Sequence, residues 1–558
     1  MNKKRLPKST YPNRYEIELD VDLDKFSYTG TQKVDLNVVE TTNKIVLNSV
    51  GIEVTKAKIQ NTEQDISLEV SYIEEDEKIV FESEEVLSKG LYELYLEFNS
   101  EITNDLKGFY KSSYMSEGGE KKWIATTQFE PTAARSAFPC WDEPEYKAIF
   151  SMTIITDEKY LRVSNEMVLE EEKIENNKLR TKFADSMKMS SYLVAFVIGD
   201  LEATVVGKSK TTDIRIIHRP GFSHQTSYAG TAAIKLLDFF EDYYKIPYPG
   251  TKLDLIAIPD FAMGAMENVG AVTFRENLLL FDKDKATRSE LDRSITVIAH
   301  ELAHMWFGDL VTMKWWDGIW LNEAFASLME VIASYNTYPE FKQWNAMNMS
   351  RTAGFSIDSL ENSRPVEFDV ETPDQAEEMF DVLTYEKGST VLRMFQMFIG
   401  EEAFQNGVEA YLNQFKFKNT NSSDLWDALS EASNQPLNKI LPYWIREKGY
   451  PFLQVDCSNN YLTIKQKPFL LRNINTDKRS IKPVPVQIKF LDTGNEEKFL
   501  LDETEKVIDL ENLGKVPHVN SGGWGFFHTF YDDEVFENIL KNFNNLNDLE
   551  KYRLLEDK

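Results

Sequence analysis

The chain has 558 residues, a mass of 64.5 kDa and a formal net charge of −29, from 91 acidic and 62 basic residues. At about 150 residues per domain, this length predicts three or four domains. The acidic balance argues against a broad nucleic-acid or anionic-membrane surface, because phosphate binding requires clustered lysine and arginine. Hydrophobic residues make up 42% and charged residues 27%, which is typical of a globular chain.

The cysteine content and the N-terminus bear on location. Cys140 and Cys457 cannot form a disulfide framework, and they lack the CxxC spacing of a thiolate metal site. The basic N-terminus leads into no apolar stretch, so we expect no signal peptide. No run approaches the roughly 18 apolar residues that a membrane span needs. These features favour a cytoplasmic protein.

The first third of the chain alternates between apolar and polar residues. From Tyr15 to Leu23 every second residue is apolar, and the same parity returns between Phe26 and Val38. A period of two predicts half-buried strands with one solvated face. Similar runs continue to Ile198, so we expect residues 1–200 to form an all-β N-terminal domain.

The middle of the chain changes to longer, helical periodicity. Four segments have the length and the 3.6-residue spacing of helices: 223–245, 289–307, 321–335 and 386–399. With a strand predicted at 253–259, we expect residues 201–450 to form a domain of mixed helices and strands. A turn at 448–451 precedes further strand-like runs, which predict a small β-sandwich at 451–532.

The C-terminal segment, 533–558, carries an amphipathic helix. Phe536, Ile539, Leu540 and Phe543 fall at i, i+3, i+4 and i+7 and define one apolar face. Two interpretations are open at this stage. The segment is either the start of a truncated helical domain, or a terminal helix that docks on the preceding sandwich.

The clearest chemical signal is the pentapeptide His300-Glu301-Leu302-Ala303-His304. On a helix, residues i and i+4 share one face, so both imidazoles can bind one ion. Glu301 follows the first histidine and is placed to act as a base on a metal-bound water. The spacing therefore predicts a zinc site. The alternative is a helix that happens to carry two core histidines.

Catalytic zinc usually keeps three protein ligands, so a third is required. Glu323 lies 19 positions after His304 on the next predicted helix, and the intervening connector is long enough to turn back. Leu310 stands where a third histidine of the extended motif would be, which favours a His, His, Glu set. In isolation, Glu323 is more typical of a solvated helix carboxylate, and only together with the pentapeptide does the pattern favour a metal ligand.

Three more motifs accompany the zinc signature: Gly264-Ala265-Met266-Glu267-Asn268, the segment 128–135 with its continuation at 138–144, and Tyr385-Glu386-Lys387-Gly388. With them the chain resembles, over nearly its whole length, the M1 family of zinc aminopeptidases, which are gluzincins. It is most similar to the puromycin-sensitive and the archaeal tricorn-interacting types. The resemblance implies a multi-domain α+β fold with a thermolysin-like α/β catalytic domain and one Zn2+ per chain.

The resemblance also implies roles for residues. His300, His304 and Glu323 would bind zinc, Glu301 would act as general base, and Tyr385 would stabilise the oxyanion. Without the resemblance, Tyr385 is more typical of a half-buried packing residue at a helix start. The substrate would be bound by eight residues: Gln128, Glu130, Met263, Gly264, Ala265, Met266, Glu267 and Asn268.

Within that set, the carboxylates of Glu130 and Glu267 would pair with the substrate's α-ammonium, which is costly to bury without a partner. Gln128 and Met263 are uncharged, and methionine adapts to many shapes, so we expect a neutral or broad N-terminal preference. The expected partners are peptides with a free N-terminus, with no nucleic acid and no membrane.

The chain differs from the family in length, because full members usually add a large helical domain after the sandwich. We therefore expect that a second chain supplies the missing helices or that the chain is truncated. Two other functions stay open. One is a catalytically silent scaffold, and the other is a thermolysin-like endopeptidase, against which Glu130 and the 264–268 motif argue. A related epoxide-opening branch lacks the small sandwich.

Overall fold

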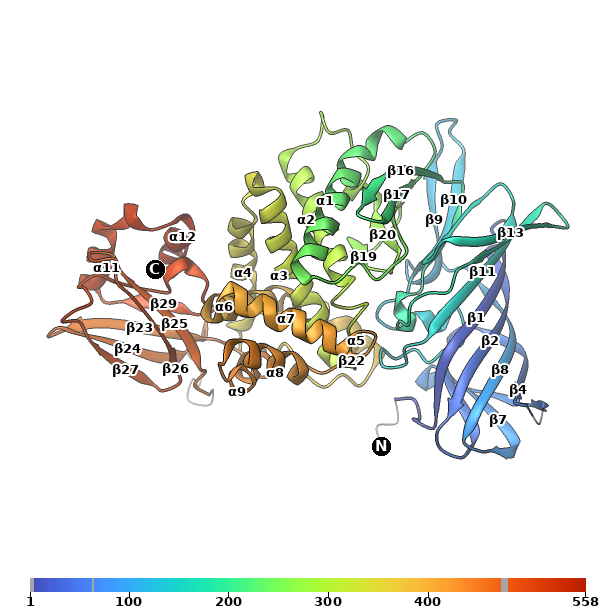
Figure 1. Cartoon of the computed structure of the whole chain (residues 1–558), viewed down its shortest axis with the longest axis horizontal. Coiled ribbons are helices and arrows are strands. Elements are labelled where there is room, and N and C mark those ends of the chain that lie inside the picture. Colours follow the sequence, from blue (N-terminus) through green and yellow to red (C-terminus); the bar gives the residue numbers. More distant parts are fainter. Residues whose placement is uncertain (1–4, 63–64, 473–479) are drawn as a thin grey trace. The chain divides into compact units, whose positions relative to one another are not determined.

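The computed structural model describes residues 5–62, 65–472 and 480–558, and is drawn in Figure 1. The chain folds into two compact units. The first comprises Met1–Trp316, Val370–Glu377 and Phe415–Thr420, and the second comprises Asp317–Asp369, Glu378–Gln414 and Asn421–Lys558. Residues 1–4 of the basic N-terminus lie outside the described residues.

The N-terminal part of the first unit is built from strands. Its largest sheet has the order β13-β14-β11-β1-β2-β8-β4-β5, and β1, β2, β8 and β4 run side by side in Figure 1. The bounds are β1 (Thr10–Asp22), β2 (Ser27–Val38), β4 (Glu53–Gln60), β5 (Asp65–Ser67), β8 (Gly90–Glu101), β11 (Ile149–Asp157), β13 (Val168–Ile174) and β14 (Lys178–Phe183). Tyr15, Ile17 and Leu19 on β1 are buried, as their alternation predicts.

Two smaller sheets complete this β-rich region. One has the order β12-β15-β10-β9 and the other β3-β7-β6. Their bounds are β3 (Thr42–Asn48), β6 (Glu69–Ile73), β7 (Lys78–Leu87), β9 (Gly108–Met115), β10 (Lys121–Gln128), β12 (Leu161–Ser164) and β15 (Phe196–Gly199). β10 ends at Gln128, so the 128–135 motif begins at the last residue of this strand.

The rest of the first unit combines a sheet with two helices. The sheet has the order β16-β17-β18-β20-β19, and helix α1 packs against β16, β17 and α2. The bounds are β16 (Glu202–Ser209), β17 (Thr212–His218), α1 (Ser227–Tyr244), β18 (Lys252–Ile258), β19 (Ala265–Met266), β20 (Ala271–Arg275) and α2 (Arg288–His304). A two-stranded ladder joins β21 (Thr312–Met313) to β22 (Asn419–Thr420) in parallel.

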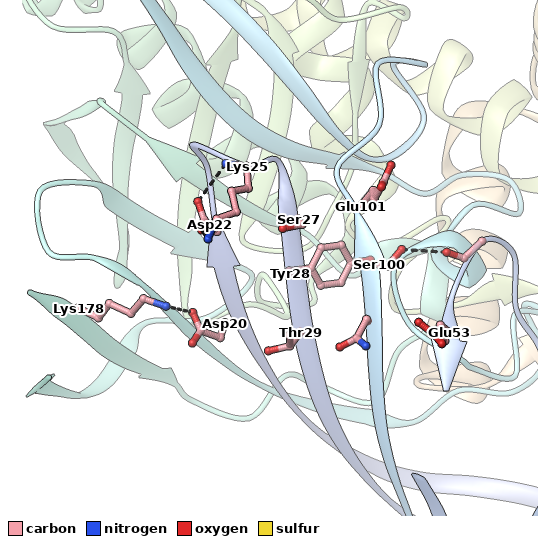
Figure 2. A pocket seen from close by; sticks show the side chains of 12 residues that line it. Asp20, Asp22, Lys25, Ser27, Tyr28, Thr29, Glu53, Ser100, Glu101 and Lys178 are labelled. Atoms are coloured by element: carbon pink, nitrogen blue, oxygen red, sulfur yellow. Dashed lines mark hydrogen bonds and ion pairs between the residues drawn. The ribbon is translucent and has the colours of Figure 1, made fainter. Parts of the chain in front are cut away.

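A polar hollow of about 620 Å³ lies over β1, β2 and β8 (Figure 2). Both lysines that line it are paired with aspartates of the hollow: Lys25 lies 2.7 Å from Asp22, and Lys178 lies 2.5 Å from Asp20. None of the predicted site residues lines it. The hollow is therefore separate from the chemistry that the motifs predict.

The second unit begins with helices. They are α3 (Trp320–Thr337), α4 (Gln343–Asp358), α6 (Gly388–Ile399), α7 (Glu401–Phe415), α8 (Ser422–Ser433), α9 (Leu437–Ile440) and α10 (Pro442–Ile445); α5 (Pro373–Glu378) belongs to the first unit through Glu377. A π-helical turn, η8 (Leu383–Lys387), precedes α6 and packs against α3 and α4. The segment 386–399 was expected to be one regular helix, so the turn is a correction.

Two sheets and two helices complete the second unit. The sheets have the orders β27-β24-β23-β29 and β26-β25-β28. The bounds are β23 (Pro451–Ser458), β24 (Tyr461–Pro468), β25 (Val484–Phe490), β26 (Glu496–Leu501), β27 (Glu505–Asp509), β28 (Pro517–Val519), β29 (His528–Tyr531), α11 (Asp533–Lys541) and α12 (Asp548–Glu556). Together the two units make a mixed α+β chain with a β-rich N-terminal part.

The apolar face of α11 is partly covered. Val535 and Ile539 are 3% and 0% exposed and pack in a cluster with Leu491, Leu546 and Leu554. Leu540, in contrast, keeps 44% of its surface exposed. The helix therefore docks through this face on the strands that precede it, which is one of the two interpretations left open by the sequence.

Candidate metal centre and substrate site

Helix α2 presents the zinc signature on a regular scaffold. Thr287 caps its first turn, accepting a hydrogen bond from the Glu290 amide at 3.2 Å, while the Glu290 carboxylate accepts one from the Thr287 amide at 2.8 Å. Apolar residues at helical spacing, including Ile295, Ile298 and Leu302, are fully buried. The capped and anchored helix places His300 and His304 one turn apart on one face.

The two imidazoles converge. Their Nε2 atoms lie 3.1 Å apart, and the Nδ1 of His304 lies 2.9 Å from the carbonyl oxygen of Phe307. Donation from Nδ1 to that carbonyl leaves Nε2 of His304 as the ligand atom. Two nitrogens bound tetrahedrally at 2.0–2.1 Å lie about 3.3 Å apart, so the observed spacing fits one shared zinc ion.

Buried carboxylates accompany the histidines in the first unit. Glu301, Glu267 and Glu130 are 4%, 2% and 8% exposed, and a Glu267 oxygen lies 3.8 Å from Nδ1 of His304. Burying anionic groups is costly unless cations are bound beside them. The arrangement therefore suits a divalent metal and a substrate ammonium.

Sequence reasoning missed two buried ionisable groups nearby. Burial raises the pKa of Asp309 well above its usual range, and the charges of Glu267 and Glu301 add to the shift. Burial lowers the pKa of Lys147 to about 7, and its ammonium group lies 3.0 Å from the carbonyl oxygen of Asp309. No residue spacing in the sequence indicates that Asp309 would be buried.

The 264–268 motif forms the edge of a sheet. Ala265 and Met266 make up β19, which pairs antiparallel with β20 and is the last strand in its sheet order. The Arg275 amide donates to the Gly264 carbonyl at 2.9 Å. A Cβ built on Gly264 would meet only a Leu278 methyl at 3.9 Å. The chain itself therefore does not require glycine at this position.

The other residues of the predicted substrate set differ in exposure. The Gln128 amide donates to the Met266 sulfur at 3.4 Å, and both side chains are buried. Asn268 is 1% exposed and donates to the Thr273 hydroxyl at 3.3 Å. Met263 is 50% exposed. The geometry thus joins Gln128 to the motif, gives Asn268 a structural contact, and leaves Met263 accessible.

Glu323 and Tyr385 lie in the second unit. Glu323 is on α3 and is 2% exposed, and Tyr385 is on the π-helical turn η8 and is half-buried. The segments that carry these two residues pack tightly against each other. A Cβ on Gly388 would lie 2.5 Å from the Cβ of Ala324, the residue after Glu323. Their positions relative to His300 and His304 stay a prediction from the sequence.

A convergent histidine pair on one helix, surrounded by buried carboxylates, is the arrangement of a metallopeptidase. Two family models match the chain, the "Peptidase family M1 domain" at residues 228–444 and the "Peptidase M1 N-terminal domain" at residues 11–193. The chain belongs to peptidase family M1, whose members are zinc metalloenzymes.

Three relatives illustrate the similarity. Aminopeptidase M1 of Arabidopsis thaliana is 38% identical over 99% of this chain and 65% of its own length. The puromycin-sensitive aminopeptidase of Caenorhabditis elegans is 37% identical, over 96% and 58%. The alanine/arginine aminopeptidase of Saccharomyces cerevisiae is 35% identical, over 100% and 65%. The chain thus spans less than two thirds of the length of these relatives.

Among residues 5–62, 65–472 and 480–558, no helix combines the length and the hydrophobicity that are needed to cross a bilayer.

Proposed function

We propose that this chain is a zinc aminopeptidase, which removes the N-terminal residue from peptides. The observation that carries the proposal is the His300–His304 pair, with Nε2 atoms 3.1 Å apart and one ring oriented by a backbone carbonyl. Zinc bound there would act as a Lewis acid and bring the pKa of a water ligand to about 7. In this proposal Glu323 is the third protein ligand.

Two side chains would carry the proton transfer and the charge stabilisation. Glu301, next to His300 on α2, would accept a proton from the attacking water and deliver it to the leaving nitrogen, a role typically worth about 10²–10⁴ in rate. The phenol of Tyr385 would donate a hydrogen bond to the oxyanion. Losing one such donor typically costs about 10²–10³ in kcat.

Specificity for a free N-terminus would come from Glu267 and Glu130. Both carboxylates are buried, so an ammonium between them gains a strong interaction that a neutral acetylated nitrogen does not. The free edge of β19 supports pairing of an extended peptide with Gly264 and Ala265 as an added strand. Gln128 and the exposed Met263 would line a neutral pocket for the first side chain.

Several finer predictions belong to the same proposal. They are a thermolysin-like catalytic domain at 201–450, a small β-sandwich at 451–532 and a short helical segment at 533–558. A cytoplasmic location also stays a prediction, and the proposed substrates are peptides rather than nucleic acids or membranes.

A peptide digest analysed by mass spectrometry tests the function. Each peptide is supplied with a free and with an acetylated N-terminus, and the zinc content is measured beside it. Sequential loss of single residues from the free peptides only is the expected result. Internal cuts in both forms would instead support the endopeptidase alternative. No cleavage by zinc-loaded protein would favour the silent scaffold.

A further inference from the structure

The segment that carries Tyr385 has an unusual backbone. Residues Leu383–Lys387 form a π-helical turn, η8, which continues into the regular helix α6. A π-turn holds one more residue than an α-turn and is rare, so it persists only where its surroundings stabilise it. The surroundings of η8 in the second unit provide such support at both ends.

The C-terminal end of η8 is held by a buried ion pair. The Lys387 ammonium lies 2.8 Å from Oδ2 of Asp358, and both side chains are 0% exposed. Oδ1 of Asp358 accepts hydrogen bonds from the Gly449 amide at 2.7 Å and the Ser363 hydroxyl at 2.8 Å. Asp358 is the last residue of α4, so the pair ties the turn to a fixed carboxylate on another element.

The N-terminal end of η8 is capped by a second charged group. Oδ1 of Asp381 accepts hydrogen bonds from the amides of Leu383 at 2.9 Å and Thr384 at 3.1 Å. Arg364 pairs with the same carboxylate and donates to the Thr384 hydroxyl at 3.1 Å. The N-terminal end of the turn is therefore held by contacts other than the Lys387–Asp358 pair.

We propose that Lys387 and Asp358 are positioning residues for Tyr385: their buried ion pair holds η8 in its π-helical form and so aims the phenol. This inference rests on the proposed role of Tyr385 in catalysis. Successive residues of an α-helix are rotated by about 100°, so relaxation of the turn to α-helical geometry would swing the phenol toward a different face. A displacement of about 1 Å is enough to cost about 10²-fold in rate.

The test compares Lys387→Met and the milder Asp358→Asn with Arg553→Met. The control removes a buried cation from the same unit, where Arg553 lies 3.1 Å from Asp557 and its side chain is 2% exposed. kcat and KM are measured on alanyl and leucyl p-nitroanilides, with melting temperature and zinc content. We expect Lys387→Met to lower kcat about 10–100-fold with KM within about threefold. Arg553→Met should leave kcat within about threefold even if it melts earlier.

Two readouts separate positioning from general stability. In a Tyr385→Phe background, Lys387→Met should cause little further loss of kcat, because the group it positions is already gone. Hydrogen–deuterium exchange of the peptide that covers 382–388 should rise at least tenfold in Lys387→Met but not in Arg553→Met. This second readout requires no catalytic activity.

The outcomes distinguish the two proposals. If Tyr385→Phe is as active as the wild type, or the wild type is inactive, the proposed catalytic role fails, and exchange alone decides whether the pair holds the turn. If Tyr385→Phe is impaired but Lys387→Met and Asp358→Asn keep full kcat, the positioning role is wrong. Fully additive losses, or unchanged exchange at 382–388, would also overturn it.

Discussion

The helix α2 and the turn η8 both carry predicted catalytic residues, but they are stabilised in different ways. α2 is a regular, capped helix whose 3.6-residue period alone brings His300 and His304 together. η8 is an irregular turn whose geometry depends on a carboxylate from another helix, Asp358. In α2, the helical period of the local sequence is enough to place the histidine pair. In η8, the irregular turn is held by a buried charge from a distant segment of the chain.

The largest expected effect is a loss of kcat on substitution of Glu301 in α2, without a loss of stability. Glu301→Gln keeps the shape of the side chain but removes the base, so kcat should fall about 10²–10⁴-fold. Zinc content and melting temperature should match the wild type. Glu290→Gln on the same helix is the control, because glutamine still completes the capping box. A Glu301→Gln enzyme with full kcat would contradict the proposed role.

The next effect concerns recognition rather than chemistry. Glu267→Gln removes one buried negative charge that we expect to face the substrate ammonium. kcat/KM on peptides with a free N-terminus should fall about 10–100-fold, since a desolvated ion pair is lost. The ratio of rates on free and acetylated peptides is the measurement. A preserved ratio would show that Glu267 does not select the amine.

Two glycine substitutions compare how tightly the backbone is packed beside η8 and at the edge strand β19. Gly388→Ala introduces a Cβ 2.5 Å from that of Ala324 and should destabilise the protein by about 1–3 kcal/mol through overpacking. Gly264→Ala meets no closer atom than Leu278 Cδ1 at 3.9 Å and should leave the free energy of unfolding nearly unchanged while raising KM. Equal stabilities, measured by urea unfolding, would contradict this difference.

The smallest effect reports on the packing of the second unit. Burial and the carboxylate of Asp532 raise the pKa of the Cys457 thiol to about 11, and Cys457 packs against the α11 cluster. At pH 8 its thiolate fraction is low, so iodoacetamide should label it roughly 100-fold more slowly than in the urea-unfolded chain. Peptide mapping separates it from Cys140. Fast native labelling would mean that α11 is not docked.

The same contrast explains what the sequence could predict. The alternation in β1 and the period of α2 depend on neighbours within one element, so the strands and the histidine pair can be predicted from the sequence. The helix expected at 289–307 ends at His304, close to the prediction. The π-turn was missed because no periodic pattern of neighbouring residues indicates it. The buried partner of Lys387 is Asp358, which lies 29 positions earlier in the chain.

The docking of α11 was one of two interpretations that the sequence left open. The apolar stripe of Phe536, Ile539 and Leu540 predicts the helix but not its partner. Ile539 is fully buried and Leu540 is 44% exposed, a difference that depends on where β23, β28 and β29 lie. Burial of Asp309 was missed for the same reason, since a single aspartate carries no periodic signal.

The ladder between β21 and β22 has a consequence for biosynthesis. Thr312 pairs with Asn419, so the strand that follows α2 finds its partner only after more than a hundred further residues have been made. At about 5–20 residues per second, this segment waits roughly 5–20 s during translation. The first unit therefore completes its pairing only when about three quarters of the chain has been synthesised.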